Sequence, residues 1–368
     1  MDIRDRRLKA RLSKWSTCSV ETKRGLVKPR KVIMFKRFLS YYKPQMGLFV
    51  ADTVCALVLA AIDLAFPIIL RNLTGGLFTQ GQAAIMQALG MIAVGLVLMY
   101  AVRCACRYFV SYWGHVMGAR MESKMREDLF DQYERFSFAY FDRNSSGDMM
   151  SRVVNDLFDI CEAAHHVPEW IIICGIEIIG SFVILFTIAP VLALAMAVVT
   201  AAFAVVMFWQ NMRMREVFSD NRKKISGINA QLQDSLAGMR VVKSFANEET
   251  ERFKFRASNN RYLSSKENMY HAMGVYTATY GLLSGVLYVI VVLLGGWLVA
   301  QGQLQAVDMA TFALYISLFC TPLETLVNSA ETYQKAIAGF KRMDEVLSTA
   351  PDIQDKPGAT DLQVTAGA

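Results

Sequence analysis

Long apolar stretches separated by polar segments dominate the chain from about residue 46 onward. A helix needs about 20 mostly apolar residues to cross the hydrocarbon core of a bilayer. Residues 170–209 are about twice that length, and Ala189-Pro190 lies at their middle, where proline disfavours helix before it. This stretch therefore predicts two helices joined by a tight turn. The whole pattern predicts an all-α membrane protein with six spans, at about residues 46–70, 83–112, 167–188, 190–212, 270–300 and 308–330.

Two polar segments, at residues 113–166 and 213–269, are too long to be simple turns between spans. In the first, Met125, Leu129 and Tyr133 are spaced by four, which places them on one face of a helix. We therefore expect the spanning helices to continue well past the bilayer into the cytoplasm. At 1.5 Å per residue, an extension of about thirty residues projects about 45 Å. Such stalks suit a transporter that receives force from a cytoplasmic motor.

Lysine and arginine are placed unevenly along the chain, and this sets the expected orientation. They gather in the N-terminal segment, in residues 120–152 and 213–266, and in the C-terminal tail, whereas the alternate connections hold only Arg71. Cytoplasmic loops of membrane proteins carry the excess of Lys and Arg. The sequence therefore predicts a multi-pass protein of the cell membrane with both termini in the cytoplasm.

The composition excludes several other classes of protein. Apolar residues make up 54% and charged residues 19% of the 368 residues, which is too apolar for a disordered chain and sparse in charge for a soluble domain. Residues 1–44 hold fourteen Lys and Arg against three acidic residues. Because this segment leads directly into an apolar span, we favour a membrane surface over nucleic acid as its partner. We expect a basic arm at 1–30 and an interfacial elbow helix at 31–44, with Lys36 and Arg37 at the membrane surface.

Three motifs resemble those of the transmembrane domains of ABC exporters. The resemblance extends over about residues 35–355, and the three motifs stand in the expected order among the six spans. They are Phe141-Asp142-Arg143-Asn144-Ser145-Ser146-Gly147-Asp148, then Ala237-Gly238-Met239-Arg240-Val241-Val242-Lys243-Ser244-Phe245, and lastly Ala338-Gly339-Phe340-Lys341-Arg342-Met343-Asp344-Glu345.

The resemblance implies the type IV exporter fold, with six long helices in residues 45–347 and a domain-swapped dimer with a second transmembrane half, identical or different. It also implies two coupling loops, at about 139–148 and 244–251, that bind nucleotide-binding domains, and a linker at 348–368 that leads toward such a domain. The exposed aromatic side chains expected at the stalk tips agree with docking into a partner's pocket. The residues implied in coupling are Tyr140, Phe141, Asp142, Asn144, Gly147, Asp148, Ser244, Phe245 and Glu248.

The sequence contains no G-x-x-x-x-G-K-[ST] phosphate-binding motif. We therefore expect ATP and Mg²⁺ to bind a nucleotide-binding domain, present in another chain or in a longer form of this one, and no cofactor or catalytic residue in this chain. Two alternatives remain open: a membrane regulator without a motor, or an inactive, truncated half-transporter. An ion-driven carrier is less favoured, because its inner loops would be short.

Ionisable residues within apolar spans are costly and usually face protein or water. Asp52, Asp63 and Glu177 are therefore candidates for a cavity that contacts substrate, although each could instead stabilise the packing of helices. Arg103 and Arg107, one helical turn apart, are interpreted as anchors that reach the lipid phosphates. The substrate itself, a small molecule, lipid or peptide, is not specified.

Metal binding is not expected from the sequence. His165-His166 has no second pair of ligands nearby along the chain, and Cys104-x-Cys106 has no neighbouring His or carboxylate. We interpret these cysteines as small packing residues, and we expect no metal site.

Overall fold

The computed structural model describes residues 30–354, 358 and 359, and these residues contain helices and no strand. The chain divides into two units, residues 1–43 and 44–368, which are described separately. In the first, α2 (Arg30–Tyr42) covers most of the expected elbow helix, with Lys36 exposed and Arg37 half-buried. Its location at a membrane interface stays a prediction, and the basic arm at 1–30 lies almost wholly outside the described residues.

The second unit is built from six long helices and several short ones. Each of the six carries a stretch that is long and apolar enough to cross a membrane, which confirms the six-span architecture. The elements are α3 (Met46–Gly75), η2 (Leu77–Thr79), α4 (Gln82–Phe109), η3 (Val110–Gly114), α5 (His115–Glu134), α6 (Phe138–Arg143), α7 (Ser146–Ser151), η4 (Arg152–Asp156), α8 (Leu157–Ile188), α9 (Pro190–Ala237), α10 (Met239–Ser244), α11 (Glu248–Ala300) and α12 (Ala306–Leu347), with η1 (Lys43–Gln45) at the junction between the units.

The turn predicted at Ala189-Pro190 is present. Helix α8 ends at Ile188, Ala189 has an extended backbone (φ −148°, ψ 94°), and Pro190 begins α9. A proline is tolerated at the first helical position because the N–H group it lacks would have no partner there. One residue therefore suffices to reverse the chain between two spans.

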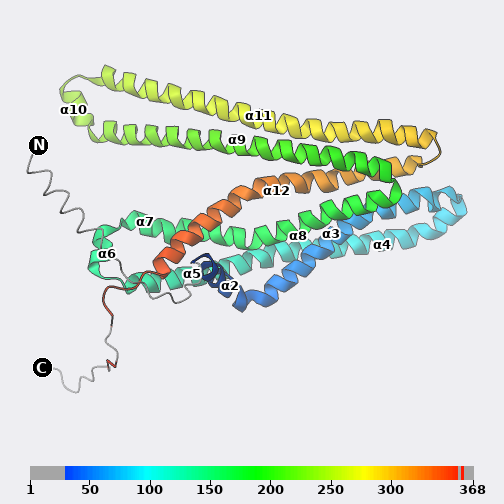
Figure 1. Cartoon of the computed structure of the whole chain (residues 1–368), viewed down its shortest axis with the longest axis horizontal. Helices are drawn as coiled ribbons and strands as arrows, with labels where there is room; N and C mark the ends of the chain where they lie inside the picture. Colours follow the sequence, from blue (N-terminus) through cyan, green and yellow to red (C-terminus); the bar gives the residue numbers. More distant parts are fainter. Residues whose placement is uncertain (1–29, 355–357, 360–368) are drawn as a thin grey trace, which may run out of the picture. The chain divides into compact units, whose positions relative to one another are not determined.

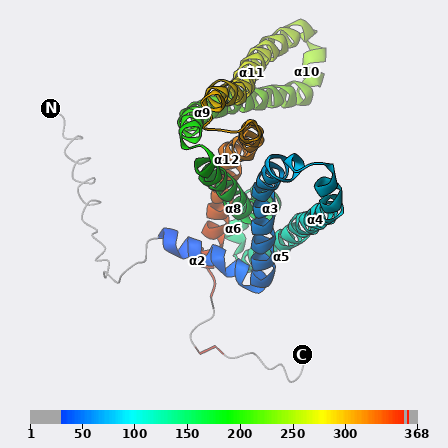
Figure 2. The ribbon, with the colours of Figure 1, turned by 90° about the vertical axis from the view of Figure 1, so that its right-hand side faces the viewer.

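Within the second unit, the helices form two groups. Helices α9 and α11 lie side by side along most of their length and are joined at one end by α10, whereas α12 packs chiefly against α8, beside α3 (Figure 1). Seen along the helices, the pair α9–α11 extends away from α3, α4 and α5 (Figure 2). With 48 residues in α9, this helix is about 70 Å long, which is far more than the hydrocarbon thickness of about 30 Å.

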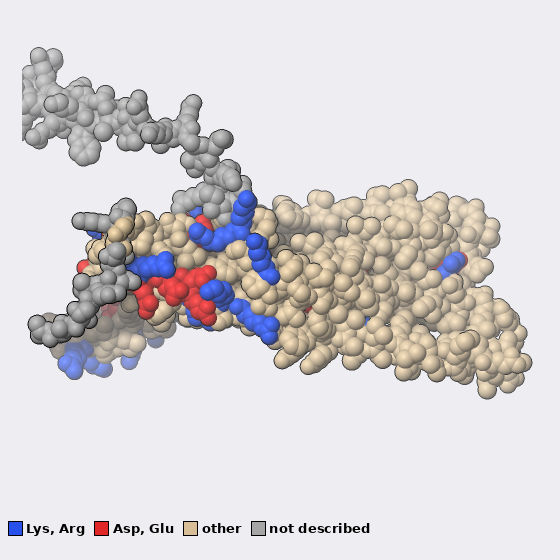
Figure 3. Space-filling view, turned by 90° about the horizontal axis from the view of Figure 1, so that it is seen from below, with Lys and Arg blue, Asp and Glu red and all other residues tan. Residues whose placement is uncertain are grey.

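Charged side chains on the surface of this unit gather toward the end that carries α6, α7 and α10. The face drawn in Figure 3 is almost free of them toward the opposite end, at the right. An uncharged surface over this length is what a lipid environment requires. We call the end that carries α6, α7 and α10 the polar end.

The apolar part has a core centred on α12. Phe312, Tyr315 and Phe319, which are spaced by three and four, are fully buried against α8, α9 and α11. The hydroxyl of Tyr315 donates a hydrogen bond of 2.5 Å to the main-chain oxygen of Leu64 in α3. Each of these aromatic side chains removes a large apolar surface from its surroundings, and the tyrosine places its polar atom on a partner.

A second core extends along the polar end. Met117, Met121, Met125, Leu129 and Tyr133 form a buried stripe with a spacing of four on α5, which packs against α8. The helix face predicted from the spacing of Met125, Leu129 and Tyr133 is therefore present and buried.

Helix α12 is fixed to the π-helical segment η4 by a close contact. Arg342 donates two hydrogen bonds to the carboxylate of Asp156, at 2.6 and 2.5 Å, and Asp156 is buried. Gly339, one turn earlier, has no room for a larger side chain, because a Cβ atom there would lie 3.2 Å from the main-chain oxygen of Asp156. A bidentate, charge-assisted pair beside a glycine contact holds these two elements in one register.

This contact gives a first prediction. Gly339→Leu should lower the free energy of unfolding by about 1–3 kcal/mol, because the side chain would push α12 from the backbone of η4. Gly90→Leu is the matched control, since a Cβ at Gly90 meets nothing within 4 Å. Thermal unfolding of the purified chain in detergent measures both, and equal midpoints would contradict the close packing at Gly339.

Candidate functional site

The first tip of the polar end combines exposed and packed aromatic side chains. Phe138 and Phe141, both in α6, are 90% and 41% exposed. Tyr140 faces inward and stacks on Phe136 with ring centroids 4.0 Å apart, and burial raises the pKa of Tyr140. The inward aromatic pair fixes α6 to the end of α5, and the rings of Phe138 and Phe141 stay exposed.

The polar residues predicted in this loop stabilise its shape. The Asn144 side chain donates a hydrogen bond of 2.8 Å to the main-chain oxygen of Tyr140, which ends α6. Asp148 in α7 pairs with Arg152 at the start of η4, at 2.7 Å. Asp142 and Gly147 are exposed.

The second tip is formed by α10 and the turn that follows. Phe245 is 79% exposed, and Ala246 after it has φ 47°, a left-handed conformation that is unusual for residues other than glycine. Lys243 and Glu248 form an ion pair of 2.9 Å across the turn. The Ser244 hydroxyl donates to the main-chain oxygen of Arg240. The short helix at residues 239–244 ends where the predicted coupling loop, 244–251, begins, and Glu248 already starts α11.

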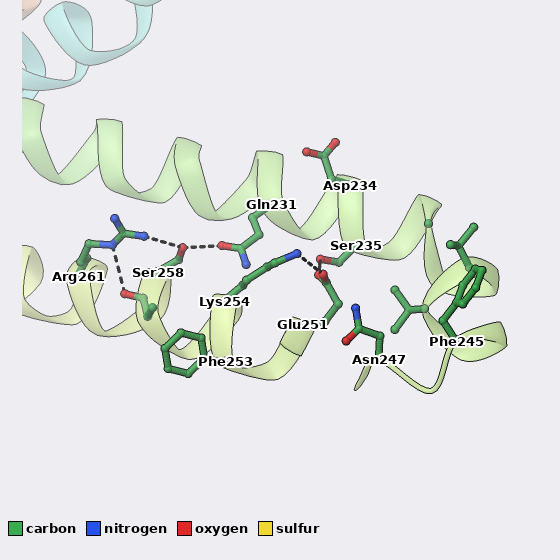
Figure 4. A pocket seen from close by; sticks show the side chains of 14 residues that line it. Gln231, Asp234, Ser235, Phe245, Asn247, Glu251, Phe253, Lys254, Ser258 and Arg261 are labelled. Atoms are coloured by element: carbon green, nitrogen blue, oxygen red, sulfur yellow. Dashed lines mark hydrogen bonds and ion pairs between the residues drawn. The ribbon is translucent and has the colours of Figure 1, made fainter. Parts of the chain in front are cut away.

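A groove of about 840 Å³ lies beside this tip, between α9 and α11. Its wall is held by hydrogen bonds between the two helices: Ser235 donates to Glu251 at 2.7 Å, and Ser258 donates to Gln231 at 2.5 Å. Figure 4 shows these residues and Phe245 at the end of the helix pair. The bonds make the end of the pair a stiff support for the exposed ring.

An open cavity of about 520 Å³ lies between α4, η3, α5, α8 and α12. Of the three carboxylates predicted to line a substrate cavity, Glu177 is among its lining residues and Asp52 and Asp63 are not. The other polar or aromatic residues that line it are Arg107, Ser111, His115, His166, Glu169, Trp170, Ser317, Thr321 and Thr325. Carboxylates, a guanidinium group and an indole ring therefore share one space.

Asp63 and Asp52 lie outside the lining of this cavity. Asp63 accepts two hydrogen bonds from Arg103 on α4, at 2.8 and 3.3 Å. Asp52 is buried, 5% exposed, close to Gly114 and His165. Arg103 thus joins α4 to α3, whereas Arg107 faces the cavity. The assignment of both arginines as lipid anchors, and of the three carboxylates to substrate, stays a prediction.

The family model for the ABC transporter transmembrane region matches residues 49–323. The chain belongs to this family, and its six apolar helices have the fold of an ABC exporter transmembrane domain in a multi-pass membrane protein.

Proteins of similar sequence that contain this region have different descriptions. An uncharacterized ABC transporter ATP-binding protein of Bacillus subtilis, YwjA, is 32% identical over 91% of this chain. An ATP-dependent lipid A-core flippase of Syntrophus aciditrophicus is 24% identical over 90%, and a putative multidrug export ATP-binding/permease protein of Bacillus subtilis, YgaD, is 23% identical over 89%. The chain spans 58%, 55% and 57% of the lengths of these three proteins, respectively.

Several residues of these sites were not singled out from the sequence. Phe138 is the most exposed of the large apolar side chains in the described part of the chain, and it precedes the motif used to find the first loop. The sequence could have indicated Phe138, because it is a third aromatic residue close to Tyr140 and Phe141. His115 lies in the first polar segment and Glu169 near the start of the third predicted span, and only the packing of α5 on α8 brings them together at the cavity.

The pair Asp63–Arg103 gives a second prediction. Asp63→Asn or Arg103→Gln alone should destabilise the chain, because each leaves a polar partner unpaired in an apolar bundle, and the double variant should recover part of the loss. A double-mutant cycle, measured by thermal unfolding of the two single variants and the double variant, should give an interaction energy of about 0.5–3 kcal/mol. Arg107→Gln, one turn away, is the control and should show no coupling to Asp63. Additive effects of the two changes would show that the pair contributes nothing.

Proposed function

We propose that the chain is the membrane-spanning part of an ATP-driven exporter, coupled to nucleotide-binding domains through α6 and α10. The observation that carries this proposal is the exposure of Phe138 and Phe245 at the tips of two helical stalks. A large apolar ring is costly to expose to water, and aromatic anchors buried in a partner's pocket supply much of the energy of an interface.

ATP and Mg²⁺ would bind those nucleotide-binding domains, and their closure would move the stalks. Helix α12 leads into residues 348–354, which are fastened to the first tip: Gln132 donates to the main-chain oxygen of Thr349 at 2.7 Å, and Ser137 donates to Asp352 at 2.9 Å. Both termini would then lie in the cytoplasm, with the polar end facing inward at the cell membrane. The cavity would open alternately to either side, and a substrate would shift this equilibrium by its difference in affinity for the two states.

The cavity favours an amphipathic substrate such as a lipid or a drug-like molecule. Glu177 supplies negative charge, Arg107 positive charge, and Trp170 and Leu318 apolar surface within the same 520 Å³. The names of the lipid A-core flippase and of the multidrug export protein agree with this chemistry. A peptide with similar groups is the alternative substrate class.

A second transmembrane half, identical or different, would pack on the pair α9–α11. Val205, Phe208 and Trp209 on α9 are 70%, 60% and 62% exposed, and the pair extends from the rest of the unit. These three apolar side chains would face either lipid or the partner half. A domain-swapped dimer would place this pair against the partner half and bring each α10 to the partner's motor.

A regulator without a motor, or an inactive half-transporter, would have the same helices but would not need anchors at the tips. An ion-driven carrier would lack the stalks. The exposed phenylalanines therefore favour the exporter.

The coupling proposal gives a third prediction. In vesicles containing the full transporter with its motor, Phe245→Ala or Phe141→Ala should abolish most ATP-dependent transport while insertion and unfolding temperature stay unchanged. Each change removes an anchor worth about 2 kcal/mol or more at the interface. Phe138→Ala should act likewise.

Phe78→Ala is the matched control, because Phe78 is also exposed, at 43%, but lies in η2 away from both tips. Transport and substrate-stimulated ATP hydrolysis are measured together. Unchanged transport in all three tip variants would remove α6 and α10 as coupling elements.

The orientation gives a fourth prediction. A single cysteine at Gln303, in the connection between α11 and α12, should react with a membrane-impermeant maleimide added to intact cells. A cysteine at Ser146, at the start of α7, should react only after permeabilisation. Each single cysteine is introduced into a functional variant from which the native cysteines have been removed. Labelling of Ser146 in intact cells would reverse the assigned orientation.

A further inference from the structure

Three histidines from two helices converge at the edge of the open cavity that Glu177 and Arg107 line. The whole sequence contains four histidines, and His115 on α5 meets His165 and His166 on α8. One ring nitrogen from each lies within 4.8 Å of the others. The centroids of the rings of His115 and His165 are 4.5 Å apart, and those of His165 and His166 are 3.9 Å apart. Helix packing therefore joins residues that are fifty positions apart in sequence.

Two of these rings are oriented by main-chain oxygens one helical turn earlier. Nδ1 of His115 lies 2.7 Å from the oxygen of Ser111, and Nδ1 of His165 lies 3.2 Å from the oxygen of Cys161. A carbonyl oxygen accepts a proton only from a ring nitrogen that carries one, so each contact places the proton on Nδ1. The unprotonated Nε2 atoms are then free to coordinate, which is the arrangement that metal-binding histidines use.

The cluster contains buried polar atoms that have no hydrogen-bond partner. Among the described residues, these include Nε2 of His165, Nδ1 of His166 and Oδ1 of Asp52, and His165 is only 3% exposed. A buried polar atom without a partner is costly. Three of them close to one another indicate a bound group that accepts both imidazole nitrogen and carboxylate oxygen.

The backbone at the end of η3 and the start of α5 lies close to His165. Gly114 and Gly118 are one turn apart, and a Cβ atom on them would lie 3.6 Å from Cδ2 and 3.3 Å from Nδ1 of this ring, respectively. The π-helical segment η3 ends at Gly114, directly before His115. Such π-helical insertions occur frequently at functional sites because they change the direction of the residues that follow.

Carboxylates complete the surroundings. Oε2 of Glu169 is 3.6 Å from Nδ1 of His166, and Oε2 of Glu162 is 3.6 Å from its Nε2. Trp170 stacks on the ring of His166 with an interplanar angle of 9°, which restricts its rotation. Carboxylate groups would balance the charge of a divalent cation here.

We propose that His115, His165 and His166 bind one divalent transition-metal ion, with Zn²⁺ as the best match, and that Glu169 supplies the fourth ligand. Tetrahedral Zn²⁺ with Zn–N distances of about 2.0–2.1 Å places its ligand atoms about 3.3 Å apart, so small side-chain rotations complete the site. Three imidazoles favour Zn²⁺, Co²⁺ or Ni²⁺ over Mg²⁺ and Ca²⁺. The ion is a resident clamp that holds α5 on α8 beside the cavity.

The site is tested on the full chain in lipid nanodiscs, purified without a histidine tag and stripped with a chelator. Titration with Co²⁺ should produce the strong visible absorption of tetrahedral coordination at one ion per chain, and Zn²⁺ should displace it. His115→Gln should weaken Co²⁺ binding at least tenfold. His271→Gln is the matched control, since this fourth histidine lies on α11 outside the cluster, and it should bind as the wild type does.

His115 is exposed, so its substitution should leave the fold intact, and unfolding temperatures without metal check this. Zn²⁺ should raise the unfolding temperature of the wild type and of His271→Gln but not that of His115→Gln. Equal Co²⁺ affinity of the wild type and a His115→Gln/His166→Gln variant would overturn the proposal, as would an octahedral spectrum in the wild type. No nucleotide or motor enters the measurement, so its outcome is independent of the proposed export function.

Discussion

Main-chain N–H and C=O groups inside a bilayer have no water to bond with, so they must hydrogen-bond to each other. This requirement governs the membrane-spanning helices of the second unit. Helices meet it within one segment, which is why the described spans contain helix and no strand. Even the reversal between α8 and α9 follows from it, since Ala189 alone leaves the helical conformation and Pro190 has no N–H to satisfy. The same helices that cross the apolar layer continue past it. The length of this continuation determines how far the polar tips lie from the bilayer.

Polar side chains within the bundle obey the same requirement. Three carboxylates form ion pairs: Asp63 with Arg103, Asp308 with Arg71 at 2.5 Å, and Asp156 with Arg342. Each pair joins two elements distant in sequence. These ion pairs fix which helices are neighbours. Buried polar atoms without a hydrogen-bond partner occur at several places in the described part of the chain, such as Ser181 and Thr200. Three of them lie around His165 and Asp52, beside the three histidines that we propose as metal ligands.

The sequence predicted the six spans, the turn at Ala189-Pro190 and the buried stripe on α5, because these depend on local periodicity and on proline. It also placed Phe245 and Phe141 at polar tips, through motifs. It did not place His115 with His165, or Arg103 with Asp63, because those contacts depend on how α5 and α4 rotate against α8 and α3. Glycine at positions 114 and 118 sets part of that rotation, and nothing in the local sequence distinguishes a packing glycine from an ordinary one.

The attachment of residues 348–354 to the first tip has a mechanical consequence. Gln132 and Ser137 hold this segment beside α6, while Arg342 holds the end of α12 on η4. In the coupling that we propose, a push delivered through α6 and a pull delivered along the tail would therefore enter the bundle at one place. The two inputs would act on a single lever, and neither could move without loading the other. The pair α9–α11 is joined to α12 by other contacts, such as the hydrogen bond that the Asn211 side chain donates to the main-chain oxygen of Val327.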